Sequence, residues 1–596
     1  MNHKKKILSK VFTNALTAYI LADIATVIGP LVDSAVIANY LEIESVAAVG
    51  LFNPFRMLIS MIGSTIAGGS RSLYTNLVGK GDLKKANFAF TFSCIFVTSF
   101  SVLVTILGII FSNNIAIFLG ASGSNANLMP LLSVYIRGML IGTPFLTTAK
   151  VLNGYMHLDH DSERTVYSLI IMTIVNILGD LVVVYFKGNL FNIAIATSVA
   201  DFVWFMVMSG HFLQTDRTLS FNLCDLKNSI QYLKSILSAG SNTIVTRLSR
   251  MFSGLAINYM LAAYANTIAI AAFSAQKSVT SLLGFAYLGI ADVVWVMSGI
   301  YYGEEDRTSL DDLQIFATKM GLKFTIIVGT IVFIFAKYFA GIYVGFHNTE
   351  ALKYGIESVR MLVLSLPIYV IVYSFANYLI SVRRIRLSNL YSFLMHFGIV
   401  VSTAFILIKL IGPRGAWVAT PIASIITLLI TFIIICTYKI ESSSFNIKRL
   451  LVPIKFGMNA GKEIEITADT QLEISGMSRI AYLYCKENNI DAFTANKLAL
   501  CIEEIGTNII EHGFKDKKPH AINIRIVIKE DEIITRIRDD CKAFNPIERY
   551  KMKTKNDDEP TKNIGIRIIM GMCNSVNYIC TFNTNNLIMK IPITKK

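Results

Sequence analysis

The sequence is short of charged residues. Asp, Glu, Lys and Arg make up 16% of its 596 residues, whereas they make up about a quarter of an average soluble domain. The shortage is uneven, because the chain is a series of long apolar runs from about 11 to 438 and reads like an ordinary soluble domain from about 446 onward. A single soluble core is excluded, and at least two units are expected.

Other absences exclude whole classes of site. None of the 8 cysteines forms a Cys-x-x-Cys pair, so neither a zinc site nor a redox motif is indicated. No stretch interleaves basic and aromatic residues, so the formal net charge of +15 does not indicate nucleic acid as a partner. No small-residue cleavage site follows the basic start MNHKKK, so the first apolar segment is predicted to be an anchor and not a removable signal peptide.

The apolar part is predicted to cross the membrane repeatedly. A spanning helix needs about 20 largely apolar residues, and we place about twelve spans in this part of the chain. They are predicted at 11–38, 46–70, 88–111, 128–147, 165–186, 190–213, 235–262, 268–300, 318–340, 357–380, 388–410 and 415–438. Alternate loops carry Lys and Arg, as at Lys84, Arg307 and Arg384. This alternation predicts a multi-pass inner-membrane protein with both termini in the cytoplasm.

The spans form two similar halves. ANYLEIESVAAVG (38–50) resembles AAYANTIAIAAFS (262–274), and VYSLIIM (166–172) resembles LYSFLMH (390–396). FNIAIATSVAD (191–201) resembles PRGAWVATPIAS (413–424), and the offset is again about 224 positions. Two six-helix repeats in the same orientation would give this offset, and such repeats place a substrate cavity between the halves.

A few polar residues inside the spans are candidates for function, because a carboxylate in the membrane is costly. Asp33 follows Pro30 in the first span, and Asp180 lies one turn after Asn176 in the fifth span. Nearby polar residues that would complete the cluster are Asn153 and Thr197. Further charges lie inside the spans or at their ends, namely Asp23, Asp201, Asp292 and Arg247.

The segments LVDSAVIANYLEIESVAAVG and AGGSRSLYTNLVGKGDLKKAN, and later NGYMHLDHDSERTVYSLIIMTIVNILGD, resemble the multidrug and toxic compound extrusion (MATE) family. The resemblance implies twelve helices in two lobes that export amphipathic, often cationic compounds against a proton or sodium gradient. It implies a coupling-cation site made by Asp33, Asn153, Asn176, Asp180 and Thr197. Asp292 is not a clear equivalent of the acidic residue that some members use in the second lobe. Flippases of lipid-linked precursors, from the same superfamily, supply an alternative substrate class.

The tail is predicted to be an α/β sandwich. Helical periodicity runs through ISGMSRIAYLYCKENNI and FTANKLALCIEEIGTNIIEHGF, whereas AINIRIVIKEDEIITRIRDD, VNYICTFN and NLIMKIPI read as strands. The predicted organisation is a membrane domain over 1–445, a linker over 446–461 and a cytosolic domain over 462–596. The run Gly457 to Glu463 is one residue too short for a P-loop and lacks its hydroxyl, so an ATP motor of that type is not indicated.

Three pieces of the tail suggest a different nucleotide site. Glu504 and Asn508 lie one turn apart on one helix face, where a carboxylate could act as a base and an amide oxygen could ligate Mg²⁺. Asp539 ends a strand, where it could accept from an adenine amino group. Gly565 precedes an apolar run and could let backbone amides approach phosphates.

In this order and spacing, the three pieces resemble the gyrase–Hsp90–histidine kinase–MutL ATPase superfamily, and specifically its anti-sigma-factor serine kinase branch. The resemblance implies that Glu504 is the catalytic general base, that Asn508 holds Mg²⁺, that Asp539 binds adenine and that Gly565 belongs to the second glycine box. Cys541 stands where a glycine is usual, which puts turnover, more than ATP binding, in question.

Two functions follow as hypotheses. The first is a secondary active exporter, coupled to H⁺ or Na⁺, whose cytosolic domain binds ATP and regulates transport. The second is a transporter-like membrane sensor whose tail is a serine/threonine kinase acting on a cytosolic protein. A third view makes the tail a docking module for a regulator. The partners expected in the first case are an amphipathic small molecule and the lipid bilayer.

Overall fold

The computed structural model describes residues 8–22, 36, 40, 43–121, 127–159, 161–214, 217–223, 225–264, 267–344, 346, 349–437, 450–453, 456–457, 463–468, 470–514, 520–541, 569–581 and 584–593. Within these residues the first part of the chain is helical, and the tail combines two helices with a sheet. This is the predicted fold class, a polytopic helical membrane part followed by an α/β domain.

The predicted spans are matched by helices, the first of which is described over 8–22. The others are α2 (Ile43–Gly79), α3 (Leu83–Ile110), α5 (Met129–Met156), α6 (Ser162–Tyr185), α7 (Leu190–Ser209), α8 (Ser229–Tyr264), α9 (Thr267–Leu282) with α10 (Leu288–Gly303), α11 (Arg307–Ile334), α13 (Thr349–Ser381), α14 (Ile385–Phe393) with α15 (Ile399–Ile411), and α16 (Gly415–Thr437). Two short helices, α4 (Ser112–Phe118) and α12 (Ala336–Val344), lie between them. Eight described helical stretches are long and apolar enough to cross a membrane.

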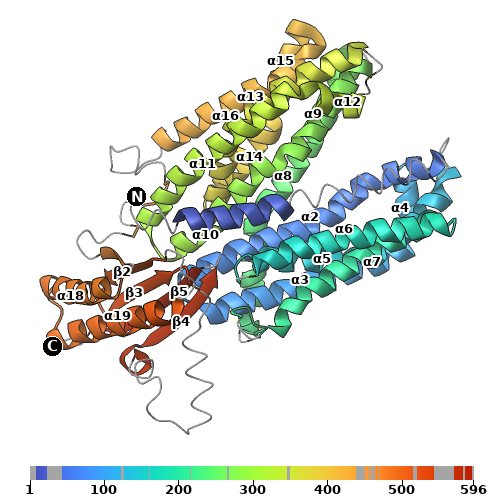
Figure 1. Ribbon diagram of the computed structural model, residues 1–596. Helices are drawn as coiled ribbons and strands as arrows, with labels where there is room; N and C mark the ends of the chain where they lie inside the picture. The colour runs from blue at the N-terminus through green and yellow to red at the C-terminus, as the bar shows by residue number, and fades with distance from the viewer. Residues whose placement is uncertain are drawn as a thin grey trace.

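The helices form two lobes (Figure 1). The helices α2 to α7 make the first lobe and α8 to α16 make the second; the lobes converge beside the sheet and diverge away from it. Backbones come very close where they converge, since a Cβ on Gly79 would lie 2.2 Å from the carbonyl oxygen of Ile300. Small residues allow such approach between membrane helices. Away from the tail, the ribbons of the two lobes lie apart.

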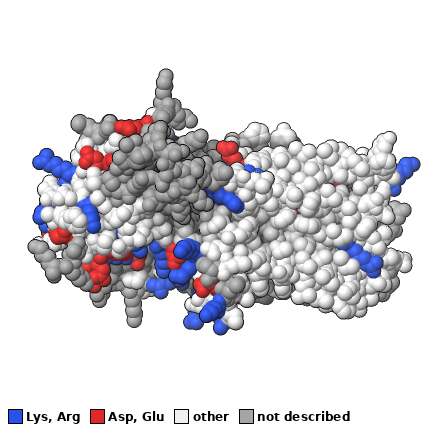
Figure 2. All heavy atoms as spheres, turned by 90° about the horizontal axis from the view of Figure 1, so that it is seen from below, with Lys and Arg blue, Asp and Glu red and all other residues white. Residues whose placement is uncertain are grey.

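Charge is distributed as a membrane protein requires. Figure 2 shows charged side chains gathered over the tail and the adjoining helix ends, with a broad, mostly uncharged area beyond them. Large apolar side chains are exposed along the spans, for example Ile106, Leu178 and Leu429. An exposed apolar surface of this extent is the surface that lipid covers.

Two predicted spans are interrupted. Between α9 and α10 lies a 3₁₀ turn, Leu283–Ala286, and between α14 and α15 lies a π-helical turn, Leu394–Gly398. Irregular turns of these kinds often mark functional positions in helices. The π turn carries His396 toward Tyr373, with ring centroids 5.3 Å apart.

The tail is an antiparallel sheet of five strands covered by two helices. The strands are β1 (Glu463–Ala468), β2 (Ile522–Ile528), β3 (Glu532–Asp539), β4 (Ser575–Thr581) and β5 (Thr584–Pro592), in the order β1-β2-β3-β5-β4. The helices are α18 (Gln471–Glu487) and α19 (Ala492–Gly513). One face of the sheet packs on these helices in a core of its own that includes Ile474, Leu498, Ile524 and Ile537. The predicted helices and strands of this domain are confirmed.

Candidate functional site

The predicted coupling site lies in the first lobe, between α5, α6 and α7. Asn176 donates to the hydroxyl of Thr197 at 3.5 Å, which joins α6 to α7. Gly179 brings the two helices together at the same level, because a Cβ there would lie 2.9 Å from Ala196 Cβ. Asp180, the next residue, is fully buried. Asn176 and Thr197 therefore contact each other inside the lobe, and Asp180 lies one helical turn after Asn176.

The other two predicted members of the coupling site are Asn153 and Asp33. Asn153 lies on α5 with its side-chain oxygen buried and without a hydrogen-bond donor among the described residues. Asp33 and Asp23 lie outside the described residues.

A charged contact between the lobes was not predicted. Arg71 on α2 lies 3.5 Å from Asp292 on α10 and stacks on the Trp295 ring at 4.1 Å. Asn377 on α13 also donates to Asp292, at 3.5 Å. This contact joins the two lobes, and it accounts for Asp292 as an interlobe ion pair.

The predicted nucleotide site of the tail is partly described. Glu504 and Asn508 lie on one face of α19, where the Asn508 amide donates to Glu504 at 3.4 Å. Gly513, at the end of α19, packs on Cys541, because a Cβ on the glycine would lie 2.8 Å from Sγ. The end of this helix thus meets the residues that follow β3. Gly565 lies outside the described residues.

Asp539 ends β3, as predicted, and is held in one orientation. Its Oδ1 accepts from the Asn585 amide at 2.7 Å and from the Cys541 backbone N–H at 3.0 Å. Burial raises the pKa of this carboxyl to about 6, and the donated hydrogen bonds act against that rise. An acceptor fixed in this way is suited to an exocyclic amino group.

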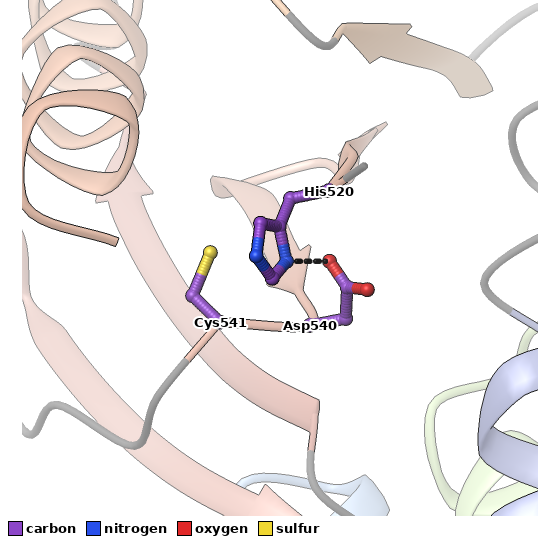
Figure 3. Close-up of side chains that lie close together, drawn as sticks. All are labelled: His520, Asp540 and Cys541. Atoms are coloured by element: carbon purple, nitrogen blue, oxygen red, sulfur yellow. Dashed lines mark hydrogen bonds and ion pairs between the residues drawn. The ribbon is translucent and has the colours of Figure 1, made fainter. Parts of the chain in front are cut away.

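Next to Asp539 lies a cluster of His520, Asp540 and Cys541 (Figure 3). Their nitrogen, oxygen and sulfur atoms lie within 4.8 Å of one another. Asp540 accepts a hydrogen bond from Lys10 at 2.5 Å, and its other oxygen lies 3.1 Å from His520 Nδ1. Burial raises the pKa of the Cys541 thiol. Asp540 is thus held between Lys10 and His520. These contacts also connect the first helix of the membrane part to the strand end that carries Asp539.

The face of the sheet opposite α18 and α19 contacts a loop of the membrane domain through hydrogen bonds and ion pairs. The loop between α10 and α11 contains Glu304, Glu305 and Asp306. Arg536 donates to Glu304 at 2.6 Å and to Asp306 at 2.7 Å, and Arg538 donates to Glu304 at 3.1 Å. From β2, a neighbouring arginine, Arg525, donates to the backbone oxygens of Glu304 and Glu305 at 3.1 Å. The two domains are joined by buried charges.

We expect Arg536→Ala to destabilise the tail and its contact with the membrane domain by about 3–5 kcal/mol. The substitution removes a positively charged partner from two buried carboxylates, Glu304 and Asp306. The measurement is thermal unfolding of the full-length protein in detergent, with protease release of the tail as a second readout. Lys529→Ala is the matched control, because its ion pair with Glu305 is exposed and should contribute less than about 1 kcal/mol. Equal destabilisation by Arg536→Ala and Lys529→Ala would contradict the conclusion that the buried Arg536 contacts hold the two domains together.

Comparison with known proteins agrees with this architecture. Residues 18–182 match the family model MatE, and residues 466–591 match the family model of the histidine kinase-like ATPase domain. The chain is 22% identical over 250 residues to the multidrug export protein MepA of Staphylococcus aureus, covering 42% of this chain and 54% of the relative. It is 24% identical over 439 residues to the probable multidrug resistance protein YoeA of Bacillus subtilis, covering 70% of this chain and 91% of the relative. The chain thus spans about half the length of MepA and most of YoeA.

Solved structures share the fold of the membrane part. An outward-facing multidrug resistance MATE family transporter of the MOP superfamily superimposes with a TM-score of 0.67 at 21% identity, covering 72% of this chain and 94% of that chain. A MOP superfamily transporter from Pyrococcus furiosus, described by its reverse polarity of binding pocket, superimposes with a TM-score of 0.64 at 21% identity over the same shares.

Proposed function

Because this chain joins a MATE-type membrane domain to a histidine kinase-like ATPase domain, we propose that it is a secondary active exporter of amphipathic compounds. The observation that carries the proposal is the buried carboxylate of Asp180, one helical turn after Asn176, which donates to Thr197 inside the first lobe. A buried carboxylate that binds a cation in one state of the transporter and releases it in the other couples a gradient to export.

The coupling ion is H⁺ or Na⁺. Asp180, with Asp33 from the first span, would supply the negative charge, and the side-chain oxygens of Asn153, Asn176 and Thr197 would supply neutral ligands. The experiment reconstitutes the full-length protein in liposomes and imposes a pH gradient or a sodium gradient separately. Dye movement that follows one gradient identifies the ion, and movement that follows neither would refute secondary transport.

The tail is proposed to bind ATP and Mg²⁺. Asn508 would ligate the metal, Glu504 would stand beside the phosphates and Asp539 would accept from adenine, because α19 and the end of β3 meet at Gly513 and Cys541. Mg²⁺ would neutralise phosphate charge there. Both termini are placed in the cytoplasm by this proposal, which is where ATP is available.

A second candidate activity is phosphoryl transfer to a serine or threonine of a cytosolic partner. The half-buried carboxylate of Glu504, held by Asn508 at 3.4 Å, favours it, because a base is needed to deprotonate a hydroxyl and an exporter needs no such group. A docking module would need neither Glu504 nor Asn508. ATP binding that both residues support would exclude that third hypothesis.

We propose that nucleotide binding reaches the transporter through Lys10 and Asp540. Lys10 lies on the first helix, and Asp540 follows the adenine-binding Asp539 directly. A nucleotide that shifts this strand end would therefore change a contact to the helix on which Asp33 is expected. The arginine contacts to the Glu304–Asp306 loop would hold the rest of the domain in place meanwhile.

Lys10→Ala should make gradient-driven export insensitive to ATP while leaving export itself within about twofold, since coupling requires contacts that differ between two states. Export is measured in proteoliposomes with and without Mg-ATP on the tail side. Lys85→Ala is the matched control, because Lys85, in the first turn of α3, forms a solvent-exposed ion pair with Asp82. ATP sensitivity that persists in Lys10→Ala would overturn this route.

A further inference from the structure

Basic side chains gather where α8 of the second lobe meets α2 of the first lobe. Lys150 on α5 donates to Ser60 of α2 at 2.6 Å. Arg247, midway along α8, donates to the same hydroxyl at 3.5 Å and to Ser64 at 2.9 Å. A lysine of the first lobe and an arginine of the second therefore meet at one serine.

The positive charges continue along α8. Arg250, one turn beyond Arg247, donates to the Tyr373 hydroxyl at 3.0 Å. The ammonium of Lys277 lies against Gly254, where a Cβ would lie 2.1 Å from Nζ. Positions 247, 250 and 254 share one face of a helix. Lys150, Arg247, Arg250 and Lys277 thus form a row, called here the basic row.

The basic row has little neutralising charge around it. None of its four members has a carboxylate within 4 Å among the described residues, although Asp201 acts on Lys150 from farther away. Other described carboxylates have partners of their own, since Asp292 lies 3.5 Å from Arg71 and Glu357 lies 3.1 Å from Arg414. Arg56 adds a further positive charge near Lys150.

The two arginines of the row lie between helices. Arg247 and Arg250 are exposed, yet each touches an inward-facing side chain of another helix, Ser64 of α2 and Tyr373 of α13. A cation midway along a span is tolerated where it lines a water-filled cavity or meets a counter-charge. The charge of Arg250 acts on Arg247 and that of Arg247 acts on Lys150. These three cations repel one another, so an anion between them is favourable.

Aromatic rings supply the apolar part of the same site. Tyr287, Tyr369 and Tyr373 pack around Arg250 with ring centroids 4.8 to 5.5 Å apart. A pocket beside them is lined by Tyr369, Tyr373 and His396 from the π turn, with Thr427 of α16. Apolar rings next to guanidinium groups bind the body of an amphiphile while the charges bind its head group.

From this arrangement we propose that the basic row and the tyrosines beside it bind amphipathic organic anions. A carboxylate, sulfonate or phosphate group is held between Arg247 and Arg250, while Lys150 and Lys277 add attraction and the tyrosines hold the apolar part. The inference rests on the proposed export function and names its substrate class, which differs from the cationic compounds expected from the family resemblance. A cationic compound would meet like charges at this position.

The experiment measures binding to the purified full-length protein in a non-ionic detergent, without any gradient, so that a failure of export does not affect it. The probes are the sulfonate dye 8-anilinonaphthalene-1-sulfonate, the phospholipid dioctanoyl phosphatidate and the cationic dye rhodamine 6G. We expect both anions to bind at least tenfold more tightly than the cation, and salt to weaken anion binding. The sulfonate tests for a free organic anion, and the phosphatidate tests for a lipid head group.

Arg247→Gln and Arg250→Gln should each weaken anion binding about tenfold, because each removes a charge-assisted hydrogen bond. Arg247→Lys keeps the charge and should stay within about threefold. Arg360→Gln is the matched control, since Arg360 is exposed and packs on Phe333 away from the row. Tighter binding of rhodamine 6G, or equal losses in Arg247→Lys and Arg247→Gln, would overturn the proposal.

Discussion

Replacing Asp539 by asparagine should weaken ATP binding about 100-fold and at the same time stabilise the tail at neutral pH. Oδ1 of Asp539 accepts from Asn585 and from the Cys541 backbone, so an asparagine must keep its oxygen on that side. Its NH₂ group then points where the adenine amino group would donate. A donor facing a donor loses the hydrogen bond and leaves both groups unsatisfied.

The stability effect has a defined sign. Burial raises the pKa of Asp539 to about 6 from an ordinary value of 3.8, so the ionised carboxylate is disfavoured in the folded protein. The free energy of unfolding therefore falls as the pH rises from about 4 to 6, and the loss is complete above about pH 6. Asparagine removes that loss, which is about 3 kcal/mol at neutral pH for a shift of this size.

ATP binding is measured by titration of the full-length protein, and stability by thermal unfolding at pH 4.5 and pH 7.5. The control is Asp531→Asn, because Asp531 is exposed in the turn between β2 and β3. Asn508→Ala should remove the magnesium dependence of binding and leave the pH profile of stability unchanged. ATP affinity within twofold of the unsubstituted protein in Asp539→Asn would remove Asp539 from the nucleotide site.

Asp180→Asn is expected to reduce gradient-driven export at least 100-fold without loss of folded protein. The carboxylate is fully buried next to the Asn176–Thr197 hydrogen bond. Its negative charge is what would bind H⁺ or Na⁺, and an amide of the same shape carries none. Because a neutral amide is easier to bury than a charged carboxylate, the variant should fold.

Export is measured as dye movement in proteoliposomes, with folding checked by gel filtration. Glu357→Gln is the control, since Glu357 forms an exposed ion pair with Arg414. Asp33→Asn should give the same loss, and the double variant should be no worse than either single one, because both carboxylates are proposed to bind the same cation. Normal export by Asp180→Asn would refute the coupling role, while a loss only under a sodium gradient would identify the ion.

Local patterns were enough to predict the parts of this protein. Apolar runs of spanning length placed the membrane helices, and alternating residues placed β2 and β3 around a turn. Spacing of four residues put Glu504 beside Asn508, and the same spacing put Asp180 one turn after Asn176. Each of these features depends on residues close together in the chain, where helix and strand periodicity decide which side chains share a face.

What the sequence did not reveal are the contacts between distant segments. Arg525, Arg536 and Arg538 read as an ordinary charged strand face, and only the fold brings them onto the loop at Glu304. Lys10 and Asp540 are separated by most of the chain. Arg247 was noticed as a charge inside a span, but its neighbours Lys150, Arg250 and Lys277 come from three helices.

The sequence by itself determined the two domains, their secondary structure and the residue types available for chemistry, because burial and periodicity are local properties of the chain. Tertiary structure decided which basic side chains meet between the lobes and which residues join the two domains. A charge acts through space on everything within several ångströms, and in a folded chain those neighbours are set by packing between helices and strands that lie far apart in sequence.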